Sequence, residues 1–315
     1  MILFIGRKLA VLVGTVLAAS VLVFFSMYMV GDPMAFLLRG RSPSPEAAAA
    51  IREQFGLDKP LLVRYFDWLF NMLRGDFGRS FQFREDVATL LASRAMVTFW
   101  LVVLSGTMIA VLGLASGIVA ALARGRFADK AILIGATGLA AIPSFVGAIV
   151  LTAVFSVKLG WFPSFGAGEG LLDTIYHLVL PALALALTFI ALVARVTRSS
   201  MVEQLDREHV EVATSRGMNR ARVVRRHVLR NALNPILTVS GLLVAGLLVA
   251  SSIVEAAFGL AGLGSLLVQS VDKLDFPVVQ AIVLIIVALF VLANTVVDIL
   301  AGVLDPRTKA GAAAR

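Results

Sequence analysis

Six apolar runs, each long enough to cross a lipid bilayer as a helix, constrain this chain more than any other feature of its sequence. A membrane-spanning helix needs about 20 mostly apolar residues, because each residue rises about 1.5 Å through a hydrocarbon core about 30 Å thick. The runs lie near residues 9–30, 98–123, 131–157, 176–197, 236–257 and 278–303. The sequence therefore predicts an all-α, polytopic membrane protein with six transmembrane helices.

The composition agrees with a lipid environment. Of the 315 residues, 59% are hydrophobic and 15% are charged, and the mean hydropathy is +0.92. A net charge of +8 would favour a nucleic-acid partner in a soluble protein, but in a membrane protein basic residues gather in cytoplasmic loops. The chain has no cysteine and its three histidines are far apart, which excludes disulfides, thiolate chemistry and a histidine metal cluster.

Arginine and lysine are distributed unevenly between the short loops. Arg124, Arg126 and Lys130 follow the second run, and nine arginines, from Arg195 to Arg230, lie at the end of the fourth run and in the loop after it. The loops after the third and fifth runs hold one lysine each, Lys158 and Lys273. By the positive-inside rule, both termini and both basic loops are predicted to be cytoplasmic. The first run is too long for the apolar region of a signal peptide, so we expect a retained helix.

The segment 31–97 is predicted to be an external loop with two amphipathic helices. Ser44 fits the N-cap of the first helix, Pro45 its first position and Gly56 its stop. A second repeat of apolar residues at helical spacing covers residues 62–73. Three interpretations remain open for this pair: helices on the membrane surface, a folded cap, or a docking surface for another protein.

The long basic loop at residues 200–235 is predicted to fold into two short helices. Residues 201–216 alternate apolar and charged side chains, and Gly217 is typical of a left-handed C-terminal stop. Asn219 fits the N-cap of a second, arginine-rich helix, which we expect to end before Pro235. The alternative is a solvated basic loop that only enforces membrane topology.

Polar residues inside the predicted spans are the next candidates for function. Glu255 lies near the outer end of the fifth span, and Asn294 and Asp298 lie in the inner half of the sixth. A charge at the bilayer centre costs about 2.5–3.5 kcal/mol on insertion scales, so these side chains are expected to face protein or water. For Asp298 we favour the interpretation that it is paired at a helix end. For Glu255 a paired helix end and a translocation path are equally good interpretations.

Proline and glycine mark expected bends and contacts within the spans. Pro143 and Pro181 are expected to kink the third and fourth helices. The spacing of Gly113 and Gly117 permits close contact between two helices. No nucleotide-binding G-x-x-x-x-G-K-[ST] loop, H-E-x-x-H motif or G-x-S-x-G elbow occurs, so catalysis by this chain is not expected.

Several segments resemble a known family in the order in which they occur. The stretch "EVATSRG", residues 211–217, is similar to the E-A-A-x-x-x-G loop of ATP-binding-cassette (ABC) importer permeases, with Val212 at the first alanine. The segments "IPSF", "LGWFPSFG", "RHVLRNALNP", "GLGSLL", "DFPVVQA" and "LDPR", with nearly all of the external loop, resemble the dipeptide, oligopeptide and nickel permeases. Ala261 departs from that family, which usually has proline there.

The resemblance implies a type I ABC importer permease fold: a first helix at 1–30, an external loop at 31–97 and a five-helix core at 98–315. It also implies that the loop at 200–235 docks into a separate cytoplasmic ATPase. The residues expected to couple the two are Glu211, Ala213, Ser215, Arg216 and Gly217.

The implied partners are a second permease, two ATPase subunits, an external solute-binding protein and membrane lipid, in the inner membrane of a bacterium. No cofactor is expected on this chain, and ATP and magnesium are expected on the ATPases.

A translocation path is expected along the second to sixth helices, where this chain meets the second permease. The glycine-rich segment 258–266, between the fifth and sixth spans, is interpreted either as a gate on the outer side or as a simple connecting turn. The candidate residues are Glu255, Phe258, Gly262 and Gly264.

Two other classes of function compete with an importer permease. A self-sufficient secondary transporter or channel would need an internal repeat or a coupling-ion site, and the sequence shows neither. A membrane anchor without transport would explain the basic loop but not the polar groups and prolines within the spans. Within the importer hypothesis, peptides, nickel chelates, glutathione and haem all remain open as solutes.

Overall fold

The computed structural model describes residues 2–30 and 58–304. Contacts along the chain define two compact units, which are described separately. The first unit is Met1–Met96 with Gly262–Val291, and the second is Val97–Ala261 with Leu292–Arg315. The helix expected at residues 44–56 lies outside the described residues.

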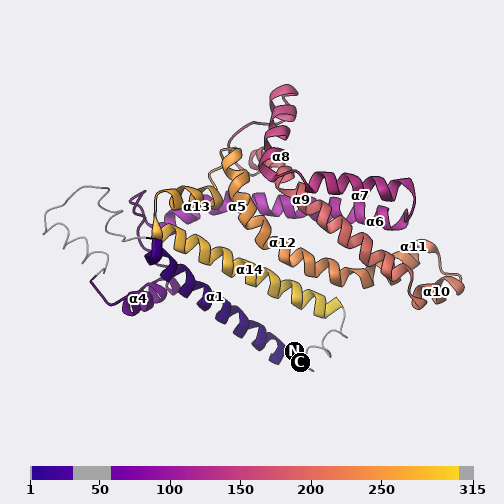
Figure 1. Cartoon of the computed structure of the whole chain (residues 1–315), viewed down its shortest axis with the longest axis horizontal. Coiled ribbons are helices and arrows are strands. Elements are labelled where there is room, and N and C mark those ends of the chain that lie inside the picture. The colour runs from indigo at the N-terminus through magenta and orange to yellow at the C-terminus, as the bar shows by residue number, and fades with distance from the viewer. Residues whose placement is uncertain (1, 31–57, 305–315) are drawn as a thin grey trace. The chain divides into compact units, whose positions relative to one another are not determined.

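The named secondary-structure elements in the described part of the first unit are all helices. Its elements are α1 (Ile2–Val30), α4 (Leu61–Leu73), the start of α5 (Val87–Met108), α13 (Leu263–Asp272) and most of α14 (Phe276–Leu304) (Figure 1). The amphipathic helix predicted at 62–73 is therefore confirmed as α4. Its end is set by Gly75, which has a positive φ of 85° and donates its N–H to the carbonyl of Met72.

A buried carboxylate fixes the loop that follows α4. Asp275 is fully buried, and its two carboxylate oxygens accept hydrogen bonds from the hydroxyl of Ser80 and from the backbone N–H groups of Phe81 and Gln82. Three donors offset the cost of burying the charge. This contact holds the loop to the turn between α13 and α14.

The second unit holds the remaining helices. They are the end of α5, η1 (Ile109–Gly113), α6 (Leu114–Leu122), α7 (Phe127–Ala140), α8 (Ser144–Leu151), η2 (Thr152–Lys158), α9 (Leu171–Leu205), α10 (Glu208–Ser215), α11 (Arg220–Val223), η3 (Val224–Leu229), α12 (Arg230–Ala257) and the end of α14. The three segments labelled η are π-helical.

Helix α9 is the centre of the second unit. It packs against α6, α7, α8 and α12, which surround it in Figure 1. Over half (56%) of its apolar span is buried, and Leu178, Leu185 and Val193 belong to the main buried cluster. The helix continues through Pro181 without a break, and the kink expected there stays a prediction.

Two glycines bring the η1–α6 segment into close contact with α9. A Cβ atom added to Gly117 would lie 2.5 Å from the Cβ of Thr197 and 2.6 Å from the carbonyl oxygen of Ala194. At Gly113 it would lie 2.9 Å from the Cβ of Val193. The predicted role of this glycine pair in close helix packing is confirmed.

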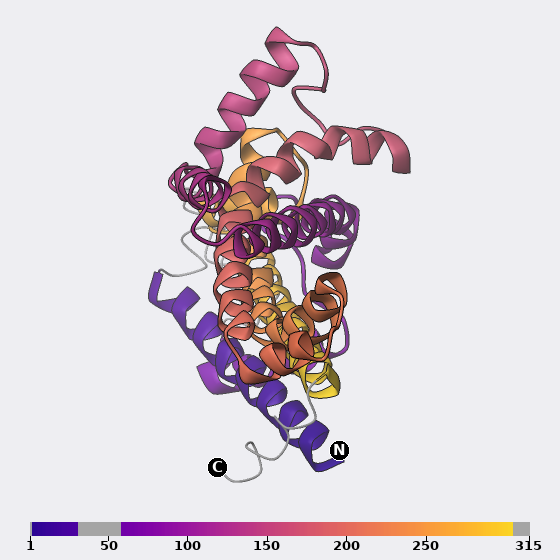
Figure 2. The same cartoon turned by 90° about the vertical axis from the view of Figure 1, so that its right-hand side faces the viewer.

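The predicted third span is not one straight helix. Helix α7 ends at Ala140 and the chain resumes as α8 and η2 after Pro143, with a bend of 99° between the two arms (Figure 2). Pro143 lacks an N–H and its backbone is extended at ψ 142°, so the helix cannot pass through it. The kink predicted at Pro143 is confirmed, but it is a break between two arms.

The described part of the chain contains five helices or helical runs that are long and apolar enough to cross a membrane, or six if the bent pair counts as one span. The five windows are Leu9–Ser26, Val87–Leu122, Leu171–Leu205, Arg220–Ala257 and Phe276–Val297. The all-α, multi-spanning class predicted from the sequence is confirmed.

We predict that Gly117→Ala destabilises the second unit by about 1–3 kcal/mol, because the added methyl group overlaps the buried side chain of Thr197 and the backbone carbonyl of Ala194 in α9. Gly106→Ala is the matched control, since no atom lies within 4 Å of its added Cβ. Thermal unfolding of the purified protein in detergent measures both variants. Equal melting temperatures for the two would contradict the close contact.

Candidate functional site

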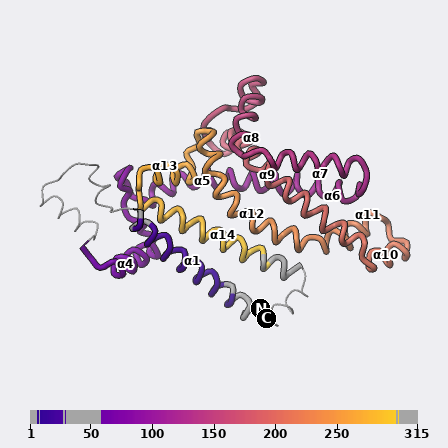
Figure 3. The backbone as a smooth tube through the Cα atoms, in the orientation of Figure 1, coloured from indigo at the N-terminus to yellow at the C-terminus, as the bar shows by residue number. Residues whose placement is uncertain are grey.

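Helix α10 is short and carries the segment that the sequence singled out for coupling. It begins after Arg207, and Glu208 and Glu211 lie in its first turn, where negative charge interacts favourably with the helix dipole. In Figure 3 the chain leaves α9, turns through α10 and returns by α11 into α12. The segment therefore forms a cap at one end of these two long helices.

The bend at Gly217 has the geometry of a Schellman motif. Gly217 has a φ of +75° and donates its N–H to the carbonyl of Thr214 at 2.9 Å, while the N–H of Met218 reaches the carbonyl of Ala213 at 3.3 Å. This confirms the predicted left-handed stop. The predicted cap at Asn219 is confirmed too, because its side-chain oxygen accepts the N–H of Ala221 at 2.9 Å.

Ala213 lies on the inner face of α10. It is 5% exposed and packs with Val210, Met201 and Val228 in one buried cluster. Its side chain therefore packs into this cluster, and its expected role in coupling stays a prediction. The small residue instead allows α10 to sit closely on the helices beneath it, which fixes the position of the short helix.

The outer face of α10 is polar and exposed. Glu211, Ser215 and Arg216 are all exposed to solvent. The side chain of Glu211 forms no hydrogen bond or ion pair within the described residues. The nearby Arg207 pairs with Glu203, with 2.5 Å between the guanidinium nitrogen and the carboxylate oxygen. A carboxylate held on a fixed helix without an internal partner is available to a cationic group of another protein.

The basic segment after α10 is not a short helix that ends before Pro235, so that prediction was wrong. Residues from Arg220 onward continue through η3 into α12, which contains Pro235 and runs to Ala257. A proline inside a helix frees a carbonyl group, and long membrane helices tolerate it when other groups satisfy the backbone. The basic segment is thus the first part of a membrane helix.

Four arginines of this segment lie beside an open pocket of about 670 Å³. Its described lining residues are Asn219, Ala221, Arg222, Arg225, Arg226 and Arg230. None of the four guanidinium groups forms an ion pair with a residue in the described ranges. The surface next to α10 is therefore strongly basic.

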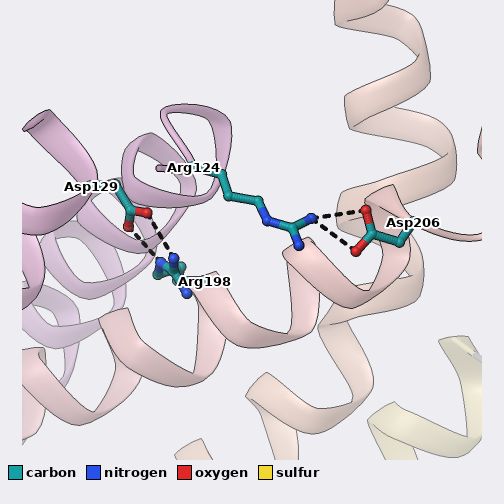
Figure 4. A network of polar contacts seen from close by, with 4 residues as sticks. All are labelled: Arg124, Asp129, Arg198 and Asp206. Atoms are coloured by element: carbon teal, nitrogen blue, oxygen red, sulfur yellow. Dashed lines mark hydrogen bonds and ion pairs between the residues drawn. The ribbon is translucent and has the colours of Figure 1, made fainter. Parts of the chain in front are cut away.

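Two ion pairs that the sequence did not predict hold the base of this region (Figure 4). Arg198 of α9 contacts both carboxylate oxygens of Asp129, at 2.5 and 2.7 Å, and Asp129 also accepts the N–H of Gly125 at 2.9 Å. Arg124 contacts both oxygens of Asp206 at 2.8 Å. The turn between α6 and α7 is thereby joined to the end of α9 directly before α10.

The two pairs differ in their exposure to solvent. The Asp129 side chain is 4% exposed and that of Arg198 25%, whereas those of Arg124 and Asp206 are 52% and 59% exposed. A buried bidentate pair constrains geometry more strongly than an exposed one. In the sequence these arginines indicated only membrane topology, and nothing in their spacing identified the acidic partners.

Glu255 and Phe258, two residues of the expected path, are both buried in the second unit. The carboxylate of Glu255 is fully buried and accepts the hydroxyl of Thr98 at 2.7 Å. Phe258 is 2% exposed and packs in the main buried cluster. Asn294 is half-buried, and the side chain of Asp298 lies outside the described residues.

Gly262 and Gly264 belong to the first unit. Gly262 is the N-cap of α13, and its N–H donates to the hydroxyl of Ser265 at 3.1 Å. Gly264 is buried in the first turn of that helix. The expected gate therefore spans residues of both units, and it remains a prediction. Within the described ranges no group of three or more His, Asp or Glu side chains could hold a metal ion.

The fold defines the class of protein. It is similar to a solved MetNI methionine ABC transporter in an inward-facing conformation, with a TM-score of 0.57 and 19% identity over 69% of this chain and 96% of that chain. It is also similar to an amino acid ABC transporter, with a TM-score of 0.50 and 22% identity over 70% and 94% of the two chains. This is the fold of type I ABC importer permeases.

The family follows from the sequence comparisons. Residues 113–310 match the family described as binding-protein-dependent transport system inner membrane component, and residues 1–102 match its N-terminal region. The glutathione transport system permease protein GsiC of Escherichia coli K12 is 38% identical over 97% of this chain and 98% of that protein. The Salmonella choleraesuis protein of the same name is 39% identical over the same shares. The chain belongs to this family of ABC importer permeases.

We predict that Asp129→Asn lowers the melting temperature by several degrees, because it leaves the guanidinium group of Arg198 largely buried without its counterion. Asp206→Asn makes the same chemical change at the exposed pair and should alter the melting temperature little. Thermal unfolding in detergent compares the two variants. A similar loss in both would show that burial does not distinguish the pairs.

Proposed function

We propose that this permease moves glutathione or other short peptides across the inner membrane, as one subunit of an ATP-driven importer. The observation that carries the proposal is the match over almost the whole chain to permeases named for glutathione transport. Substrate choice in such a system also depends on the solute-binding protein, so longer peptides and nickel chelates are the competing solutes.

The energy for transport comes, in this proposal, from two separate ATPase subunits. The chain has no phosphate-binding loop of its own. ATP and magnesium would therefore bind to the ATPases. A second, similar permease would complete the membrane channel, and an external binding protein would deliver the solute.

The surface that we assign to ATPase docking is the outer face of α10, with the bend at Gly217. Its supports are the exposed carboxylate of Glu211, the exposed Ser215 and Arg216, and the inward packing of Ala213. Because α10 is held by the buried cluster and directly follows Asp206, which pairs with Arg124, a force applied to it would reach α9 and α12.

Transport then requires two conformations of the permease that nucleotide stabilises to different extents. Closure of the ATPases with bound ATP would pull on α10 and favour one state, and the loaded binding protein would favour the same state. A docking helix that moved freely on its support would lose this differential effect. The packing beneath α10 is therefore part of the coupling.

We propose that α10 and both termini are cytoplasmic, in agreement with the arginines around α10 and in the turn between α6 and α7. The chain has no native cysteine, so a single Ser215→Cys substitution tests this directly. An impermeant maleimide should label Cys-substituted protein only after the membrane of intact cells or spheroplasts is opened. Labelling from the outside would reverse the topology.

We predict that Gly217→Val lowers glutathione uptake and transport-stimulated ATP hydrolysis by roughly tenfold in the reconstituted complex with its binding protein. A β-branched residue at φ +75° strains the bend by about 1–3 kcal/mol, which shifts α10 from its docking position.

Glutathione uptake by the unaltered complex is measured first. If glutathione does not enter while another peptide does, that peptide replaces glutathione as the proposed solute.

Gly160→Val is the matched control for this variant. Gly160 also has a positive φ, 66°, with no atom within 4 Å of an added Cβ, but it lies at the end of η2 and outside the docking surface. Equal loss of coupling in both variants would indicate general strain. Unchanged stimulation in Gly217→Val would show that the bend has no part in coupling.

A further inference from the structure

Helix α4 has a broad apolar face of which only a part packs inside the first unit. At about 100° per residue, its polar residues Arg64, Asp67 and Asn71 share one narrow stripe. Tyr65 and Trp68 form a second stripe, which packs against α1. The third, which we call the outer stripe, consists of Leu62, Phe66, Phe70 and Leu73.

The outer stripe is exposed along its whole length. Its side chains are 64%, 53%, 57% and 73% exposed, in the order of the sequence. Large apolar groups gathered at this density rarely face water in a stable protein. The stripe therefore needs an apolar environment.

The contact with α1 places α4 against the apolar part of that helix. The hydroxyl of Tyr65 lies 2.9 Å from that of Ser20 in a buried hydrogen bond, and the ring of Phe24 lies 5.4 Å from Tyr65 and 5.2 Å from Trp68. These contacts join one turn of α1 to one turn of α4. Helix α4 thus touches α1 at Ser20 and Phe24.

Ser20 lies inside the membrane-spanning window of α1, Leu9–Ser26. It is six residues from the end of that window, which corresponds to roughly 9 Å along the helix axis. Amphipathic helices at a bilayer surface bury their apolar faces about 5–10 Å into the boundary between headgroups and acyl chains. The attachment point of α4 on α1 therefore lies within the apolar window of the span.

The exposed surface of α1 near this point is also apolar. Leu17, Val21 and Leu22 are 43%, 41% and 68% exposed, as expected for a helix that faces lipid. The polar stripe of α4, by contrast, requires contact with water. Asp67 forms an exposed ion pair with Lys59 at 2.6 Å, which needs water.

We propose that α4 is an interfacial helix whose outer stripe inserts into the acyl chains of the lipid leaflet next to the end of α1. Under the topology proposed above this is the outer leaflet. Hydrocarbon covers the outer stripe, and the polar stripe faces water. The lipid contact holds the loop after α4 near the bilayer, and it leaves the polar stripe as the side of α4 open to the binding protein.

Lipid-quenching of single-cysteine variants tests this arrangement in the assembled transporter. A bimane label is placed at Phe66→Cys or Phe70→Cys in the outer stripe, and at Asn71→Cys in the polar stripe as the matched control on the same helix. The complex is reconstituted into phosphatidylcholine vesicles with bromine at acyl carbons near the headgroup. Iodide in the aqueous phase is the second quencher.

The outer-stripe labels should lose roughly half of their emission in brominated lipid and little with iodide, whereas the label at position 71 should show the reverse. Iodide quenching of the outer-stripe labels equal to that at position 71 would place the stripe in water and overturn the proposal. Protection from both quenchers would overturn it as well, since another protein chain would then cover the stripe. Transport-stimulated ATP hydrolysis, measured for each variant with the binding protein present, confirms assembly and is independent of the lipid result.

Discussion

Close contact between α6 and α9 at Gly113 and Gly117 is the constraint on which the second unit depends. Between helices in lipid there is no hydrophobic driving force for association, because the acyl chains are as apolar as the side chains. Membrane helices therefore associate through close backbone approach and tight packing. The two glycines remove the side chains that would separate the helices, and α9 becomes the element on which α7, α8 and α12 are assembled. The same contact places the end of α9 next to the turn between α6 and α7.

The candidate docking site is built on that end of α9. The Asp129–Arg198 pair connects α9 to the turn, and the buried cluster around Ala213 and Val228 holds α10 in place. These contacts face inward, while Glu211 and the arginines of the following segment face outward without internal ion pairs in the described ranges. Rigid support below and free charge above are what a surface that transmits force between two proteins requires.

Local signals in the sequence predicted individual turns correctly and continuous elements less well. Gly217, Asn219 and Pro143 were interpreted correctly, because each acts through backbone geometry within a few residues. Pro235 was misread as a helix end, because its effect depends on whether surrounding groups satisfy the freed carbonyl. Ala213 was expected to take part in coupling, and the structure shows that its small size serves packing against α11 and α12 in a cluster that includes distant residues.

The sequence by itself determined the all-α membrane-spanning class, the stop at Gly217 and the presence of α4, because hydropathy, helical period and backbone preference are properties of neighbouring residues. Its motifs also identified the permease family. Only the tertiary structure decided which acidic residues pair with Arg124 and Arg198, because these partners are 82 and 69 residues away in the sequence. It also decided the burial of Glu255 against Thr98 and the three hydrogen bonds to Asp275. These contacts depend on which helices meet and in which rotation, and that is set by packing across the whole unit.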